Sequence, residues 1–131
     1  MAMSMNHFNH YYQLLRQFAD SPTTSLREGP SVYPAVPGVY GIRLTGSGEW
    51  LRAGRTDASL RQRIYRNHLM GSQDGNLRAQ LVRHHVCQTL EEAKDWMRDY
   101  CLVQYMPIVE DGLRHRFEHF LLAALNPRYC D

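Results

Sequence analysis

The sequence has no apolar run close to the roughly 20 residues that a membrane-spanning helix requires. Its first ten residues lack a basic flank followed by an apolar core, so we expect no signal peptide. The three cysteines include no Cys-x-x-Cys pair, and an odd number leaves one thiol unpaired in any disulfide scheme. These absences argue against a membrane protein or a disulfide-stapled extracellular scaffold, and they predict a cytoplasmic protein with reduced thiols.

Lysine is almost missing, because the chain has fourteen arginines and one lysine. A formal net charge of +2 is too small to indicate a nucleic-acid-binding protein by itself. Five arginines, however, fall within fifteen residues that contain one acidic residue, which gives a local net charge of +4. This arginine cluster consists of Arg52, Arg55, Arg61, Arg63 and Arg66. Guanidinium groups bind phosphate in a bidentate way, so the cluster favours contact with nucleic acid.

The first 37 residues have the pattern of an accessory arm to a single domain. Residues 7–19 place Phe8, Tyr11, Tyr12, Leu15 and Phe18 at helical spacing, which predicts an amphipathic helix. Residues 20–37 contain four prolines and no sustained period, so we expect a long connector. The apolar stripe of the helix is typical of core packing or of a homodimer surface rather than of a platform for stacking bases.

Residues 38–131 predict a compact α+β domain. The expected strands are 38–45, 49–55 and 102–109, and the expected helices are 59–70, 76–86, 89–100 and 112–125. The first strand alternates, with Tyr40 and Val39 on opposite faces, and is expected to be half-buried. Ser59 is suited to cap one helix, and Thr89 with Glu92 forms a capping box for another. The fold class that follows is a small three-stranded, largely antiparallel sheet flanked by helices, with an extra N-terminal helix.

Familiar catalytic motifs are missing: the chain has no phosphate-binding loop, no Gly-x-Ser-x-Gly elbow and no His-Glu-x-x-His. His115 and His119 stand one helical turn apart beside Glu118, as metal ligands often do. Two histidines at that spacing without a third ligand are more often solvated, so we do not expect a zinc site there.

Four landmarks follow one another on the expected elements. Gly38-Val39-Tyr40 lies on the first strand, Ala53-Gly54-Arg55 on the second, Arg63 on the next helix, and Glu118 on the last helix before Pro127-Arg128-Tyr129. In order and spacing these residues resemble the GIY-YIG nuclease family, including the nuclease domain of the excision-repair incision subunit and small stand-alone endonucleases. The resemblance covers about residues 36–131.

The resemblance implies a divalent-metal-dependent endonuclease that hydrolyses phosphodiester bonds in DNA, with single-stranded or structured DNA as candidate substrates. It assigns Glu118 to Mg²⁺ or Mn²⁺ and Arg63 to catalysis. The chemistry agrees, since one carboxylate can hold a Mg²⁺ that keeps most of its waters and an arginine can clamp the phosphate. Tyr40 would assist water activation. A free phenol has a pKa near 10, so this role requires a nearby cation, for which Arg55 and Arg52 are candidates.

Each of these side chains also has a purely structural interpretation. Glu118 would otherwise be solvated or paired with Arg114 one turn earlier, Arg63 would lie on the surface, and Tyr40 would be a strand aromatic. The nucleic-acid-binding set that we expect is Arg52, Arg55, Arg61 and Arg66.

Three positions depart from the family pattern. Arg52 replaces the tyrosine of the second triplet, Cys130 replaces an asparagine, and Asn67 stands where a tyrosine or histidine usually follows the helix arginine. His68 is adjacent and is an alternative catalytic base, and one inserted residue between Thr56 and Ser59 would shift this register. The departures leave a second hypothesis open, a catalytically degenerate module that holds nucleic acid for a partner. The N-terminal helix is the candidate for homodimer formation.

Overall fold

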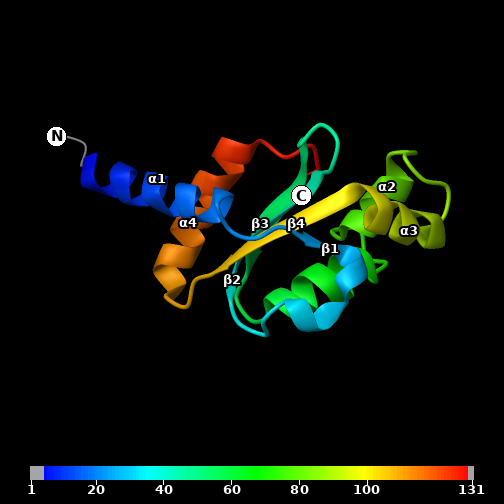
Figure 1. Ribbon diagram of the computed structural model, residues 1–131, viewed down its shortest axis with the longest axis horizontal. Helices are drawn as coiled ribbons and strands as arrows, with labels where there is room; N and C mark the ends of the chain where they lie inside the picture. The colour runs from blue at the N-terminus through cyan, green and yellow to red at the C-terminus, as the bar shows by residue number, and fades with distance from the viewer. Residues whose placement is uncertain (1–4, 130–131) are drawn as a thin grey trace.

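The computed structural model describes residues 5–129 and arranges them as an α+β fold (Figure 1). Its α-helices are α1 (Met5–Ala19), α2 (Leu77–Arg83), α3 (Leu90–Tyr100) and α4 (Asp111–Leu125), and η3 (Gln62–Leu69) is a π-helix. The strands are β1 (Thr24–Ser25), β2 (Gly38–Leu44), β3 (Trp50–Thr56) and β4 (Cys101–Pro107), and η1 (Leu26–Glu28) and η2 (Pro30–Val32) are short 3-10 helices. No helix within residues 5–129 combines the length and the apolar character needed to cross a membrane.

The sheet has four strands in the order β1-β4-β2-β3, and every pairing is antiparallel. The prediction of three strands was therefore wrong, because it missed β1 inside the connector. Thr24 pairs with Val103 and Ser25 with Leu102 across the edge of β4. Two residues are too few to show the alternation by which a strand is recognised, and their place in the sheet comes from long-range backbone pairing.

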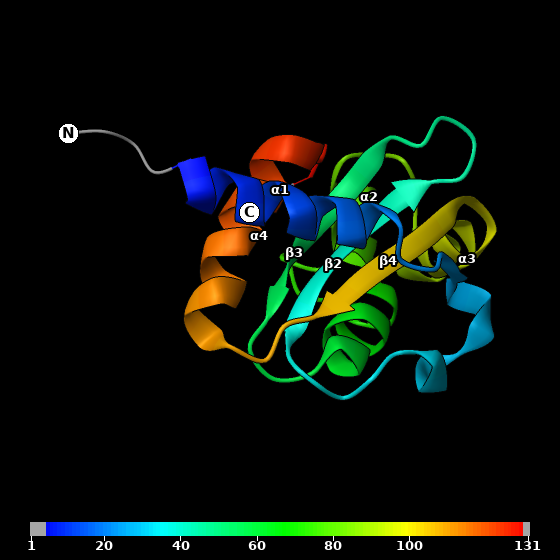
Figure 2. The same ribbon diagram turned by 60° about the vertical axis from the view of Figure 1, so that its left-hand side comes forward.

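Both faces of the sheet are covered by helices, with α1 and α4 on one face and η3, α2 and α3 on the other (Figures 1 and 2). Tyr40 and Ile42 belong to the larger apolar core on the η3 side, whereas Val39 packs in the core on the α4 side. The predicted alternation of β2 is confirmed. Its predicted half-burial was wrong, since residues 38–42 are all buried, because α4 and the α1 helix of the arm together cover the second face.

The helix caps predicted from the sequence are formed by the expected hydroxyl groups. Ser59 Oγ accepts a hydrogen bond from the Gln62 N–H at 3.1 Å, and Thr89 Oγ1 accepts one from the Glu92 N–H at 3.1 Å. The carboxylate of Glu92 bonds the N–H of Gln88 rather than that of Thr89, so the capping box is shifted by one residue. These caps fix the starting points of the two helical segments that lead into η3 and α3, on the face of the sheet opposite α1 and α4.

Candidate functional site

A pocket of about 400 Å³ opens at the β3 edge of the sheet, and its lining comes from β2, β3, η3, α4 and the loop after β3. Its walls combine positive, acidic and apolar side chains. The lining residues are Tyr40, Arg52, Ala53, Gly54, Arg55, Asp57, Arg63, Glu118 and Leu122. Four of the five residues predicted to be catalytic thus border one pocket, although they come from four elements spread over the chain.

Tyr40 enters the pocket from β2, directly opposite Gly54 on β3. Its side chain is almost fully buried, and a Cβ atom built on Gly54 would lie 3.0 Å from the Tyr40 hydroxyl oxygen. Gly54 therefore provides the room in which the hydroxyl sits. At Gly38 a Cβ atom would lie 2.5 Å from the carbonyl oxygen of Met106, so that glycine allows β4 to approach β2.

His68 lies behind Tyr40, completely buried, with its Nε2 atom 2.6 Å from the Tyr40 hydroxyl oxygen. Its Nδ1 atom accepts a hydrogen bond from the Leu77 N–H at 2.9 Å. An amide can only donate, so Nδ1 carries no proton, and the neutral ring carries its proton on Nε2. Burial, with the positive charges of Arg63 and Arg52, holds the pKa of His68 well below its ordinary value. His68 is consequently a neutral donor to the Tyr40 oxygen rather than a base.

The π-turn of η3 explains why His68, and not Asn67, reaches Tyr40. The Met70 N–H bonds the carbonyl of Tyr65, five residues earlier, as the wider turn requires. The extra residue per turn brings His68, five residues after Arg63, towards the side of the helix that faces the pocket. Asn67 instead accepts a hydrogen bond from the Gln62 side chain at 3.1 Å.

Glu118 projects from α4 into the pocket, with 13% of its side chain exposed. Its Oε1 atom accepts a hydrogen bond from Arg55 Nη1 at 2.7 Å. The alternative pairing of Glu118 with Arg114 is not formed, because Arg114 contacts Asp57 and Asp111 instead. Burial alone would lower the pKa of Arg55, but the hydrogen bond and charge of Glu118, aided by Asp57, raise it above its usual value.

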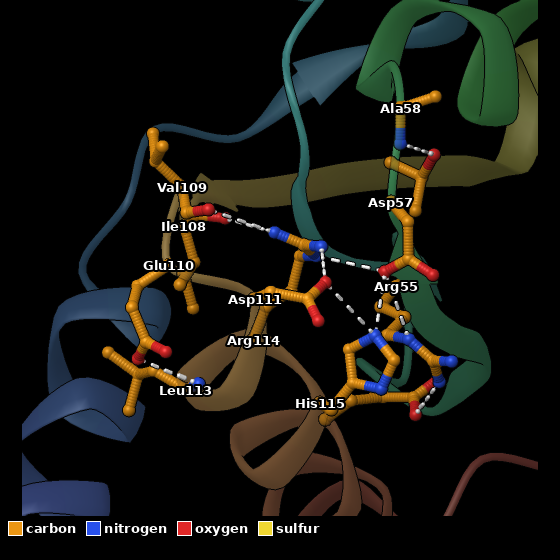
Figure 3. A network of polar contacts seen from close by, with 12 residues as sticks. Arg55, Asp57, Ala58, Ile108, Val109, Glu110, Asp111, Leu113, Arg114 and His115 are labelled. Atoms are coloured by element: carbon orange, nitrogen blue, oxygen red, sulfur yellow. Dashed lines mark hydrogen bonds and ion pairs between the residues drawn. The ribbon is translucent and has the colours of Figure 1, made fainter.

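Arg55 also connects the pocket to a polar network at the start of α4 (Figure 3). Asp57 Oδ1 accepts hydrogen bonds from Arg55 Nε at 3.2 Å, Arg114 Nε at 3.0 Å and His115 Nε2 at 3.1 Å. Burial opposes ionisation of Asp57, but the hydrogen bond from Arg114 and the neighbouring positive charges lower its pKa below the usual value. Arg114 is itself buried and donates to the carbonyls of Ile108 and Val109. The network therefore fixes Arg55 in front of Glu118.

The Glu118 carboxylate is a suitable ligand for a hard divalent cation such as Mg²⁺, which proteins usually hold through one or two carboxylates while it keeps several waters. Of the two carboxylates that line the pocket, Asp57 is occupied by Arg55 and Arg114, whereas Glu118 Oε2 has no hydrogen-bond partner within residues 5–129. Arg55 contacts both carboxylates and neutralises part of the negative charge that would otherwise attract a cation.

A second group of candidate metal ligands consists of Asp57, Asp111 and His115, whose ligand atoms all lie within 4.8 Å of one another. The sequence did not indicate it, because the three residues come from two segments. Asp57 already accepts bonds from Arg55 and Arg114, so two guanidinium groups stand where a cation would approach. His119, the second histidine considered for zinc, is exposed.

The arginine cluster separates in space. Arg52, Arg55 and Arg63 line the pocket, and Arg63 Nη1 donates to Asn76 Oδ1 at 3.3 Å. Arg61 Nε donates to the carbonyl of Tyr33 at 2.9 Å and so ties the connector to η3, and Arg66 is exposed away from the pocket lining. Of the expected binding set, Arg52 and Arg55 therefore line the pocket, and Arg61 and Arg66 do not.

The sequence did not single out Asp57 or Asn76, the partners of Arg55 and Arg63. Asp57 was visible as the one acid inside the arginine cluster, whereas nothing near Asn76 indicated its contact with a residue thirteen positions away. The Pro-x-Tyr segment runs beside β3, where the Tyr129 N–H bonds the carbonyl of Leu51 at 2.9 Å. Cys130 lies outside the described residues.

Comparison of the chain with protein-family models, with curated proteins and with solved structures finds no match in any of the three. The GIY-YIG resemblance therefore remains a prediction that depends on the residues quoted for it.

Proposed function

We propose that the protein is a divalent-metal-dependent endonuclease that hydrolyses phosphodiester bonds in DNA. The observation that carries this proposal is the convergence of a tyrosine, three arginines and a glutamate on one pocket from β2, β3, η3 and α4. Phosphodiester hydrolysis needs a group that takes a proton from water, cations for the phosphoryl oxygens, and a carboxylate for a metal ion. The pocket contains a candidate for each requirement.

Tyr40 is the group that we assign to water activation. The water oxygen forms a bond to phosphorus, the water proton passes to the Tyr40 oxygen while the Tyr40 hydroxyl proton passes to solvent in the pocket, and the bond between phosphorus and the leaving oxygen breaks. Solvent protonates the leaving oxygen. His68 supports this step, because its Nε2–H donates to the Tyr40 oxygen, on which negative charge develops as the two protons move.

Arg63 and Arg55 are placed to bind the phosphate. Both line the pocket, and each is oriented by a neighbour, Arg63 by Asn76 and Arg55 by Asp57. A planar guanidinium held in one orientation can contact two phosphoryl oxygens at once. Mg²⁺ or Mn²⁺ held by Glu118 would polarise the phosphate and offset developing charge.

The free thiols of Cys87 and Cys101 agree with the reducing cytoplasm to which we assign the protein.

Cleavage of labelled DNA tests the proposal. Single-stranded, duplex and hairpin DNA would each be incubated with Mg²⁺, with Mn²⁺ and with EDTA, and a matched RNA would test the choice of DNA. We expect metal-dependent cutting by the wild type, and a loss of at least a hundredfold for Glu118→Gln and Arg63→Ala. Arg128→Ala is the matched control, because Arg128 pairs with Glu49 outside the pocket and its loss should leave cutting unchanged. Metal-independent cutting, or cutting that survives Glu118→Gln, would contradict the proposal.

One observation favours the second candidate function, a non-catalytic module that holds nucleic acid. Arg55 lies 2.7 Å from Glu118 and occupies the carboxylate that a metal ion would need. If this ion pair persists in the working protein, the pocket is a phosphate-binding site with no metal. In that case the wild type would bind DNA, binding would weaken in Arg63→Ala and Arg55→Ala, and no metal would produce cutting.

A further inference from the structure

The N-terminal helix presents two different faces. Tyr11, Leu14 and Phe18 pack towards α4 and the sheet, which accounts for part of the apolar stripe predicted from the sequence. A neighbouring face of the helix is mostly exposed and repeats at helical spacing. We call it the α1 stripe, and it consists of Met5, Phe8, Asn9, Tyr12 and Arg16.

The aromatic side chains of the α1 stripe are not explained by core packing. Phe8 and Tyr12 are each 50% exposed, and their rings are nearly parallel, inclined by 10° with centroids 6.4 Å apart. An exposed pair of parallel rings one turn apart offers two flat surfaces to an incoming planar group. Planar rings of this kind stack on unpaired bases with little dependence on sequence.

The charge of the helix is also suited to nucleic acid. No acidic residue occurs between positions 5 and 19, and Arg16 has no ion-pair partner within residues 5–129. Arg16 follows Tyr12 by one turn and therefore lies at the end of the stripe, where a phosphate beside a stacked base would be. An interface between two copies of the chain would favour a continuous apolar face, whereas exposed Asn9 interrupts this one.

The stripe adjoins the candidate active site through α4. Glu118 points from α4 into the pocket, while Phe120 of the same helix meets Phe8 with ring centroids 6.0 Å apart. Arg116 Nε donates to the Tyr11 hydroxyl at 3.1 Å and joins the two helices. Figure 2 shows α1 lying across α4 on this side of the sheet. A DNA strand that leaves the pocket has to cross only α4, a helix about 10 Å wide, to reach α1.

We propose that the α1 stripe binds an unpaired strand of DNA next to the site of cleavage, with its bases stacked on Phe8 and Tyr12 and a phosphate contacted by Arg16. This proposal rests on the proposed function and adds to it a preference for substrates with a single-stranded segment. Duplex DNA keeps its bases inside the helix and cannot use the two rings.

The test compares the Phe8→Ala/Tyr12→Ala double variant with the wild type in fluorescence-anisotropy binding of labelled oligo(dT) and of a duplex, in EDTA so that nothing is cut. We expect the double variant to bind oligo(dT) about tenfold or more weakly and the duplex equally well. The Phe8→Tyr/Tyr12→Phe variant keeps both rings and should bind like the wild type. Val109→Ala, at an apolar site that is 79% exposed elsewhere, controls for loss of exposed surface.

Three results separate this proposal from the proposed function. Unchanged oligo(dT) binding in the double variant, together with weaker binding in Arg63→Ala, would overturn the α1 stripe and leave the pocket standing. A wild-type dimer that the double variant converts to a monomer in light scattering would show that the stripe is an interface between copies, and would overturn its assignment to DNA. A wild type that binds no nucleic acid would overturn both.

Discussion

The Nε2 atom of His68 lies 2.6 Å from the hydroxyl oxygen of Tyr40, inside a core where His68 is completely buried and Tyr40 almost so. The Leu77 N–H occupies the other ring nitrogen, so the histidine can only donate to the tyrosine. This one-way hydrogen bond leaves the Tyr40 hydroxyl proton free to face the pocket. It also makes His68 a positioning residue for Tyr40, a role that differs from the base expected from the sequence.

Replacement of His68 by glutamine should destabilise the protein and change its response to pH. The pKa of His68 is depressed in the fold, so the unfolded chain binds the proton more readily, and the wild type loses stability as pH falls below the ordinary histidine value of about 6.5. The stability that depends on a neutral His68 is fully present above this pH. The free energy of unfolding, measured with urea between pH 8 and pH 5, should fall more steeply for the wild type than for His68→Gln. Equal slopes would contradict a buried, neutral His68.

Removal of the Tyr40 hydroxyl should separate catalysis from stability. Tyr40→Phe keeps the ring in the core and deletes the group assigned to water activation, so we expect a loss of cutting of about 10²–10⁴-fold. Tyr105 is paired with Tyr40 across the sheet and donates its hydroxyl to the carbonyl of Val32, which makes Tyr105→Phe the matched control. Both variants should unfold at similar urea concentrations. Cutting that falls equally in both would argue against a special role for Tyr40.

Gly54→Ala should disturb the candidate site through packing alone. The added methyl group would lie 3.0 Å from the Tyr40 hydroxyl oxygen, and the buried ring has little freedom to withdraw. Overpacking of this kind costs about 1–3 kcal/mol of unfolding free energy. Gly46→Ala is the control, because nothing lies within 4 Å of the position that its Cβ would take. Urea denaturation of the two variants measures the difference, and equal stabilities would show that the Tyr40 hydroxyl moves aside without a cost in stability.

Asp57→Asn should weaken the network that holds Arg55. It removes a carboxylate that is 51% exposed but pairs with the buried Arg114, and because solvent screens part of that attraction the loss should cost about 1–2 kcal/mol. Asp111→Asn affects the same arginine from a side chain that is 77% exposed, so its effect should stay below about 1 kcal/mol. Because the pKa of Asp57 is lowered in the fold, its contribution should disappear as pH falls below about 3.8. Thermal unfolding of both variants at pH 7 and pH 3 provides the comparison.

Arg55→Gln should reveal whether Arg55 competes with a metal ion for Glu118. The guanidinium lies 2.7 Å from the carboxylate and neutralises it, so its removal should tighten binding of Mn²⁺ several-fold. Electron paramagnetic resonance of free Mn²⁺ measures the affinity directly, without any cutting. Glu118→Gln is the control that should lose the binding. Weaker Mn²⁺ binding in Arg55→Gln would show that the ion pair assists the metal site instead of opposing it.

Elements that depend on neighbours along the chain were well predicted. The alternation of residues 38–45 and the hydroxyl caps at Ser59 and Thr89 depend on contacts within a few residues, and each is present in the structure. β1 was missed, because its two residues become a strand only where β4 lies beside them. Four of the predicted site residues border one pocket, whereas Asp57 and Asn76, which contact the pocket arginines from separate segments, were missed.

The sequence by itself determined the α+β class, the order of most elements, and the supply of arginines and carboxylates that line the pocket. The tertiary structure decided which of these groups meet. Arg55 rather than Arg114 pairs with Glu118, Arg61 is bound to the carbonyl of Tyr33, and the π-turn of η3 brings His68 to Tyr40. The physical reason is that ion pairs and hydrogen bonds act over a few ångströms in space, and packing of the helices on both faces of the sheet sets those distances.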